Sequence, residues 1–140
     1  DRLIKSEEIS GIKLSSYYEG FEKNCLKIKT DFVTFLNEAK KNKKKISGYG
    51  AAAKGNTLLN YSNVDSKLIP YVVDLNPAKQ GKFLPGSKIK IVDEDYLKID
   101  KPDFIVIFPW NIKNEIINQL EYTKEWNVKF VIAIPHLEII

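Results

Sequence analysis

Apolar residues recur at alternating steps of four and three positions through the first third of the chain. This spacing keeps them on one side of an α-helix. The pattern predicts one continuous helix over residues 14–42, which at ~1.5 Å per residue would be roughly 40 Å long. Either this apolar seam covers a sheet, or part of it packs against another domain or a second copy. The seam consists of Leu14, Tyr18, Phe21, Cys25, Ile28, Phe32, Phe35 and Ala39.

Beyond residue 43 the pattern changes to short apolar runs that alternate with helical segments. Continuous apolar strands separated by helices are typical of a parallel sheet covered on both faces. We therefore expect an α/β fold over residues 43–140, a Rossmann-like three-layer domain with a mostly parallel sheet of about five strands. Strands are predicted at Lys44–Tyr49, Lys67–Asp74, Lys88–Val92, Asp103–Phe108 and Lys129–Ile134, and helices at Lys54–Tyr61, Glu94–Leu97 and Asn111–Trp126. The last helix is expected to be amphipathic, and its buried side would consist of Ile112, Ile116, Leu120 and Trp126.

The first predicted strand runs into the segment GYGAAAKGN, residues 48–56. Gly48, Gly50 and Ala53 satisfy G-x-G-x-x-A, in which the first glycine makes the turn, the second lets the backbone approach a pyrophosphate, and the third lets helix and strand pack closely. Lys54 and Asn56 would lie in the first turn of the next helix, where free N–H groups favour an anion. A plain strand-to-helix corner remains the alternative.

Other polar and aromatic residues follow the predicted strands at the same edge of the sheet, where ligands of such folds bind. Asp74 ends the second strand, as a ribose-binding acid does in dinucleotide-binding proteins, or it is a turn residue. Trp110 and Asn111 follow the fourth strand. The candidate substrate-binding residues are therefore Gly48, Tyr49, Gly50, Ala51, Ala52, Ala53, Lys54, Asn56, Asp74, Trp110 and Asn111.

Composition excludes several classes of site. The formal net charge is +4, but Arg2 is the only arginine among 22 basic residues, so we expect no nucleic-acid partner and read Lys40–Lys45 as a solvated helix end. Cys25 is the only cysteine and His136 the only histidine of this sequence, so the chain cannot form a disulfide framework or a Cys/His zinc site by itself. No apolar run reaches membrane-spanning length, and we expect a cytoplasmic protein. His136 is expected to be a surface residue, and no catalytic residue is predicted.

Four blocks of this chain resemble the C-terminal domain of the sugar C-methyltransferases, which methylate a ring carbon of a nucleotide-linked keto sugar. The resemblance extends from about Ser15 to Ile134. In order along the chain the blocks are GYGAAAKGNTLLNY, YVVDLNPAKQGKFLPGSKIKI, PDFIVIFPWNIKNEI and KFVIAIP.

The resemblance implies a bacterial enzyme of deoxysugar biosynthesis in three parts, of which this chain is the last. A zinc-binding region and a central S-adenosylmethionine domain would precede it, with residues 1–13 as the linker. The methyl donor, zinc and catalytic base would belong to those upstream parts, so this chain is expected to be inactive alone. Its partners would be the nucleotide-linked sugar and the upstream domains.

Two other functions stay open on the sequence. The G-x-G-x-x-A spacing and Asp74 also permit an NAD(P)-binding domain of an oxidoreductase or sensor. Alternatively, the chain is an interaction module that docks through its long helix, and the glycine turn is only architectural.

Overall fold

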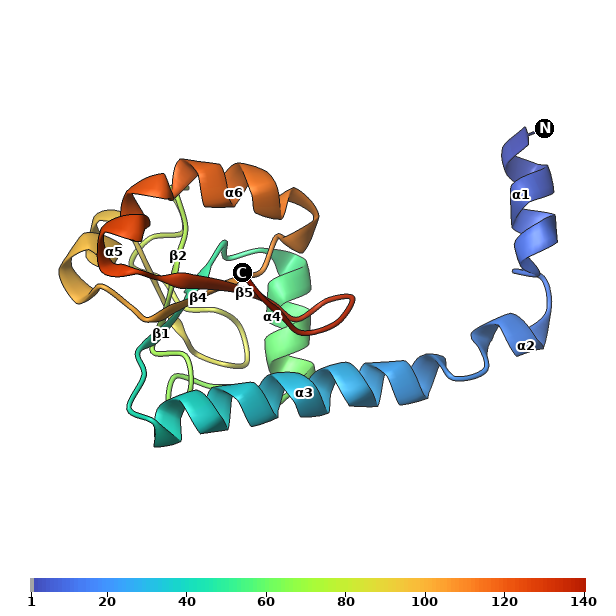
Figure 1. Cartoon of the computed structure of the whole chain (residues 1–140), viewed down its shortest axis with the longest axis horizontal. Helices are drawn as coiled ribbons and strands as arrows, with labels where there is room; N and C mark the ends of the chain where they lie inside the picture. The colour runs from blue at the N-terminus through green and yellow to red at the C-terminus, as the bar shows by residue number, and fades with distance from the viewer. Residues whose placement is uncertain (1) are drawn as a thin grey trace.

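The computed structural model describes residues 2–140 and contains one six-stranded sheet (Figure 1). The strand order is β3-β2-β1-β4-β5-β6, with parallel pairing from β3 to β5 and antiparallel pairing between β5 and β6. This confirms the predicted α/β fold with a mostly parallel sheet; the short antiparallel edge strand β6 was not predicted. The strands are β1 (Ile46–Tyr49), β2 (Tyr71–Val73), β3 (Lys90–Val92), β4 (Phe104–Ile107), β5 (Lys129–Ile132) and β6 (Glu138–Ile139).

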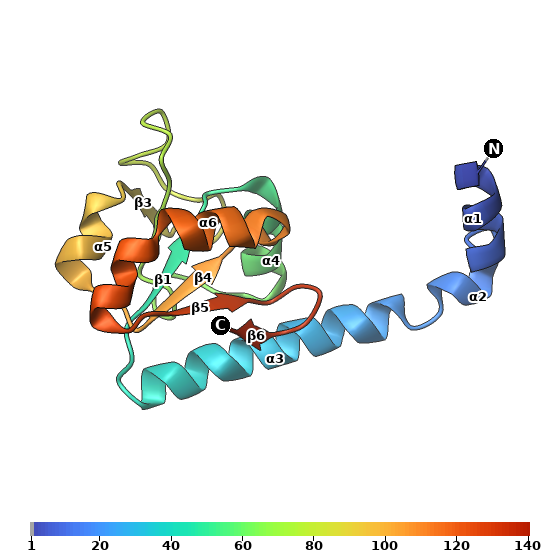
Figure 2. The same ribbon diagram turned by 45° about the horizontal axis from the view of Figure 1, so that its top comes forward.

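Helices cover both faces of the sheet, because alternate strand residues are apolar on each side. Val72 and Val106 pack with α3 (Phe21–Lys41) and α4 (Ala53–Tyr61). Tyr71, Val73 and Ile105 point to the opposite face and pack with α5 (Asp95–Asp100) and α6 (Lys113–Gln119). Figure 2 shows α6 and α3 on opposite sides of the strands. Each face thus has its own apolar core.

The predicted helix over Asn111–Trp126 is interrupted. A 3₁₀ turn, η1 (Trp110–Ile112), precedes α6, and a second 3₁₀ segment, η2 (Glu121–Trp126), follows it. Ile116 and Leu120 are buried as the sequence predicted, whereas Ile112 is 42% exposed. The apolar positions were therefore only partly predictive of the helix's buried side.

The long helix predicted before the sheet is confirmed, but it is not continuous over residues 14–42. Two helices occupy this region, α2 (Ser15–Tyr18) and α3, and they are separated where Glu19 is extended and Gly20 has a φ of 88°. A left-handed residue interrupts the helical hydrogen bonds, and only glycine adopts it without steric cost. Within the predicted linker, residues Arg2–Ser10 form α1, which has no buried residue and lies away from the sheet in both views (Figures 1 and 2).

The sheet's winding direction reverses between β1 and β4, which are adjacent although β2 and β3 lie between them in sequence. In open α/β sheets this reversal leaves a crevice beyond the carboxyl ends of the two strands. Gly50 follows β1 there, and Pro109 follows β4; a Cβ atom added to Gly50 would lie 2.5 Å from Pro109 Cδ. The glycine-rich segment is therefore at the expected edge of the sheet.

Candidate functional site

Most backbone N–H groups of the turn after β1 already donate hydrogen bonds to acceptors within the protein. The N–H of Gly50 donates to the Val73 carbonyl at 2.7 Å, that of Ala51 to Asp74 Oδ2 at 2.8 Å, and that of Ala52 to the Gly50 carbonyl at 2.8 Å. An anion at this turn would have to displace these bonds. The N–H groups of Gly50, Ala51 and Ala52 are thus committed to the protein's own structure.

The small residues of the segment have different roles from those that the G-x-G-x-x-A spacing predicted. Gly48 lies inside β1, where an added Cβ would be 2.6 Å from Phe108 Cε2 and 2.8 Å from Val72 Cγ2. Gly50, with a φ of 85°, makes the turn. Ala53 is exposed, and the close contact between helix and strand is at Gly55, whose added Cβ would lie 2.5 Å from Phe108 Cβ. The predicted roles of Gly48 and Ala53 were therefore wrong.

Gly55 was missed by the sequence analysis, although it directly follows Lys54 in the quoted segment. Phe108 is 1% exposed and fills the space that Gly48 and Gly55 leave open. The sequence feature that could have revealed this contact is a large aromatic residue directly after β4 together with two glycines in and near β1. These glycines are explained by the packing of one side chain.

Asp74 is hydrogen-bonded through both carboxylate oxygens. Oδ1 accepts from the Asn76 N–H at 2.9 Å, and Oδ2 accepts from the Ala51 N–H and from Lys79 Nζ, the latter at 3.0 Å. Lys79 Nζ also donates to the Ala51 carbonyl at 3.0 Å. Burial alone would raise the pKa of Asp74, but these donors outweigh burial and lower it. Asp74 is therefore ionised and holds the Ala51 peptide in place, and it has the turn role that the sequence left open.

The first turn of α4 is the open part of the segment. Ala52 is the N-cap and its methyl group accepts no hydrogen bond, so the N–H groups of Ala53, Lys54 and Gly55 lack partners within the helix. These groups and the helix dipole favour an anion at this end of α4. The free N–H groups are thus those of the first helical turn, where the sequence analysis placed Lys54 and Asn56, and not those of the preceding glycine turn.

Lys54 reaches from this turn to the residues that follow β4. Its ammonium donates to Asn111 Oδ1 and lies 4.9 Å from the centre of the Trp110 ring. Both contacts are with neutral groups, so the charge of Lys54 is not neutralised by them. The structure thereby brings together three predicted site residues, Lys54, Trp110 and Asn111.

Asn56 lies in the same helical turn and is half-buried. Its Oδ1 atom is buried and has no hydrogen-bond partner within residues 2–140. The side chain therefore does not extend into solvent beside Lys54.

Tyr49 was predicted to contact the ligand, but its hydroxyl points to the face of the sheet that α5 and α6 cover, whereas Lys54 belongs to α4 on the opposite face. It donates to Glu94 Oε2 at 2.8 Å and accepts from Gln119 Nε2 at 2.6 Å, and Tyr122 donates to Glu94 Oε1 at 3.2 Å. Burial, and then the Glu94 carboxylate, raise the pKa of Tyr49. This network, which the sequence analysis missed, connects β1 to α6, to η2 and to Glu94 at the start of α5.

An apolar groove starts at Lys54 and extends between α4 and the first half of α3. We call it the α3–α4 groove; its volume is about 600 Å³. Its apolar lining consists of Phe21, Cys25, Ile28, Leu58, Tyr61, Trp110 and Ile134.

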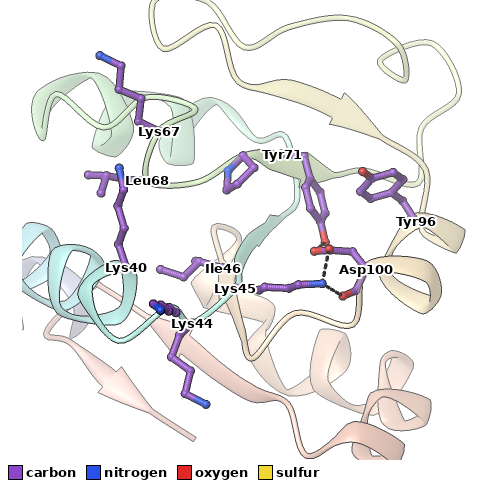
Figure 3. A pocket seen from close by; sticks show the side chains of 11 residues that line it. Lys40, Lys44, Lys45, Ile46, Lys67, Leu68, Tyr71, Tyr96 and Asp100 are labelled. Atoms are coloured by element: carbon purple, nitrogen blue, oxygen red, sulfur yellow. Dashed lines mark hydrogen bonds and ion pairs between the residues drawn. The ribbon is translucent and has the colours of Figure 1, made fainter.

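A second hollow, of about 390 Å³, lies at the amino ends of β1 and β2 and is rich in lysine (Figure 3). Lys45 Nζ donates to Asp100 Oδ1 at 3.0 Å, and Asp100 Oδ2 accepts from the Tyr71 hydroxyl at 2.9 Å. Lys44 points away from the hollow and pairs with Asp103 at 2.9 Å. Two lysines of the basic run are therefore neutralised by acids of the same fold.

Catalysis, metal binding and membrane insertion would each require a particular arrangement of side chains within residues 2–140. His136 is exposed. Within this range no three His, Cys, Asp or Glu side chains are grouped so that they could hold a metal ion. No helix in the same range combines the length and apolar character needed to cross a membrane.

Comparison with known proteins identifies relatives of the whole chain. A sequence model of the family described as "C-methyltransferase C-terminal domain" matches residues 1–135. The C-methyltransferase NovU of Streptomyces niveus is 28% identical over 138 residues, which cover 99% of this chain and 33% of NovU. The chain therefore spans about a third of the length of this curated relative.

Proposed function

Because the chain belongs to the family of C-methyltransferase C-terminal domains, we propose that it binds the nucleotide end of a nucleotide-linked sugar within a longer methyltransferase. In this proposal the first turn of α4 holds the diphosphate. The observation that supports it is the uncapped N-terminus of α4 with Lys54 in its first turn, beside Trp110 and Asn111.

The chemistry of this turn suits a diphosphate. Three N–H groups and one ammonium would converge on an anion that approaches α4 along its axis. Trp110 would offer an aromatic face to the base or the sugar, and the Asn111 amide could bind a hydroxyl group once Lys54 turns toward the phosphate. Asp74 and Lys79 would act indirectly, by fixing the Ala51 peptide that precedes α4.

The same geometry counts against a Rossmann-type site for S-adenosylmethionine or NAD(P). Such a site needs a free acid after β2 to accept the ribose hydroxyls. Asp74 occupies that position, but its side chain is only 11% exposed, and both of its oxygens already accept hydrogen bonds from the protein. We therefore assign the methyl donor, together with zinc and the catalytic base, to the part of the enzyme that precedes this chain, and we expect this chain alone to be inactive.

The domain would contribute to catalysis through binding energy. Contacts with the nucleotide, remote from the reacting carbon, would help to hold the sugar in position beside the methyl donor. Affinity for the nucleotide would then depend on Lys54 and Trp110, and the chemical step on the preceding domain.

A lysine substitution tests this proposal. A hydrogen bond to a charged group contributes about 1.5–3 kcal/mol, so Lys54→Ala should weaken binding of thymidine diphosphate glucose about 10-fold or more by calorimetry. Lys129→Ala is the matched control, because Lys129 is exposed at the amino end of β5, the opposite edge of the sheet. Equal affinity of the two variants would contradict the assignment of Lys54.

A further inference from the structure

The apolar side of α3 is longer than the sheet surface that it covers. Phe32, Phe35, Leu36 and Ala39, from its second half, are buried in the core. The first half continues the same seam through Phe21, Cys25 and Ile28, but Phe21 is 69% exposed, and Cys25 and Ile28 are only half-buried. Figure 1 shows this half of α3 extending beyond the strands. The seam therefore has a stretch that the rest of the chain leaves uncovered.

This uncovered stretch forms one wall of the α3–α4 groove. The facing wall comes from α4, where Leu58 is buried and Tyr61 is 44% exposed. Trp110 also lines the groove, and its ring lies beside the Lys54 ammonium. A groove of this size lined by large apolar groups is a disfavoured surface in water and is typical of a protein contact.

Exposed apolar residues continue from the groove toward the N-terminus. Leu14, Tyr17 and Tyr18, which precede α3, are 61%, 52% and 59% exposed. Isolated exposed apolar residues are normal, but a run that adjoins a groove marks an interface. The apolar surface thus leads along the chain in the direction of residue 2.

The relatives indicate what lies in that direction. The matching family is described as a C-terminal domain, and this chain corresponds to 33% of NovU. In such an enzyme the remaining two thirds would precede α1, on the same side in sequence as the groove-lining start of α3. A segment tethered so closely has an effective concentration of about millimolar, which favours it over a second copy in dilute solution.

We propose that the α3–α4 groove is the docking site for an apolar segment of the methyltransferase part that precedes this chain. This inference rests on the proposed membership of a longer enzyme. Phe21, Cys25 and Tyr61 would become buried, and the docked segment would end beside Trp110 and Lys54. The preceding domain would thereby be fixed next to the nucleotide-binding turn of α4.

Hydrogen exchange tests the docking. The full-length enzyme and the present chain are compared by mass spectrometry, and we expect amides of residues 21–28 and 57–61 to exchange at least 10-fold more slowly in the full-length enzyme. Phe21→Glu in the full-length enzyme should abolish that difference. Leu26→Glu is the matched control, because Leu26 is exposed on the same helix outside the groove and should leave the protection unchanged.

Two results would overturn the docking proposal. One is equal exchange of these amides in the full-length enzyme and the present chain. The other is protection that appears only as the concentration of the present chain rises, with dimers in sedimentation, which would make a second copy the occupant. Either result is separable from the proposed function, because Lys54-dependent binding of thymidine diphosphate glucose is measured independently on the same full-length enzyme.

Discussion

The Asp74 carboxylate accepts a hydrogen bond from the Ala51 N–H at 2.8 Å, and this bond joins the segments that follow the paired strands β2 and β1. This bond consumes the N–H group that a bound pyrophosphate would use in a Rossmann-type turn, and it puts a negative charge there. We therefore propose the first turn of α4, and not the glycine turn, as the position for an anion. The same bond makes the stability of the turn depend on the ionisation of Asp74.

Asp74→Asn should destabilise the chain by about 1–3 kcal/mol at neutral pH, because it removes the ion pair with Lys79 and places an amide among N–H donors. The lowered pKa of Asp74 means that its contribution is present above the ordinary pKa of 3.8 and is lost as pH falls through the native value. Urea unfolding at neutral and acid pH should therefore show a weaker acid dependence in Asp74→Asn. Asp95→Asn is the control, since Asp95 is 81% exposed in its pair with Lys98. An unchanged acid dependence in Asp74→Asn would contradict this prediction.

Gly55→Ala should destabilise the chain even though alanine favours helices by about 1 kcal/mol relative to glycine. The added methyl group would lie 2.5 Å from Phe108 Cβ, and overpacking of a buried contact costs about 1–3 kcal/mol. Thr57→Ala, on the exposed side of the same helix, should be close to neutral. Thermal unfolding compares the two variants, and a more stable Gly55→Ala would refute the packing role of Gly55.

Tyr49→Phe should cost about 1 kcal/mol at neutral pH, because it removes a hydrogen bond to Glu94 and one from Gln119. The raised pKa of Tyr49 implies stability that is present below the ordinary value of 10.0 and lost as pH rises above it. Alkaline unfolding should therefore be less steep in Tyr49→Phe. Affinity for thymidine diphosphate glucose should not change, because the hydroxyl faces α6. A loss of affinity would contradict this assignment and indicate that Tyr49 contacts the ligand.

Local pattern predicted the parts of this fold that depend on neighbouring residues. The apolar runs located five strands, and the segment from Lys54 to Tyr61 is helical as expected. The break at Gly20 was missed, because the apolar spacing continues across it and a single glycine is tolerated in helical patterns. Because the carboxyl ends of parallel strands meet at one edge of a sheet, the sequence also placed Lys54, Trp110 and Asn111 at that edge, where Lys54 contacts the other two.

Roles that depend on distant residues were not predictable in the same way. Gly48 and Gly55 are small because Phe108, which directly follows β4, occupies their side-chain space. Asp74 is a turn residue because the Ala51 N–H comes within hydrogen-bonding distance only after β1 and β2 pair. The glycine spacing alone gave no information on either partner.

A titration of the labelled chain by NMR tests the central claim most directly. Thymidine diphosphate glucose, guanosine diphosphate mannose, NADH and S-adenosylmethionine are added separately at matched ionic strength. We predict shifts at the amides of Ala53, Lys54 and Gly55 and at the Trp110 indole with the diphosphate sugars, none of comparable size with S-adenosylmethionine, and loss of these shifts in Lys54→Ala. Shifts produced by NADH instead would favour an oxidoreductase domain, and the absence of any shift at α4 would contradict the account.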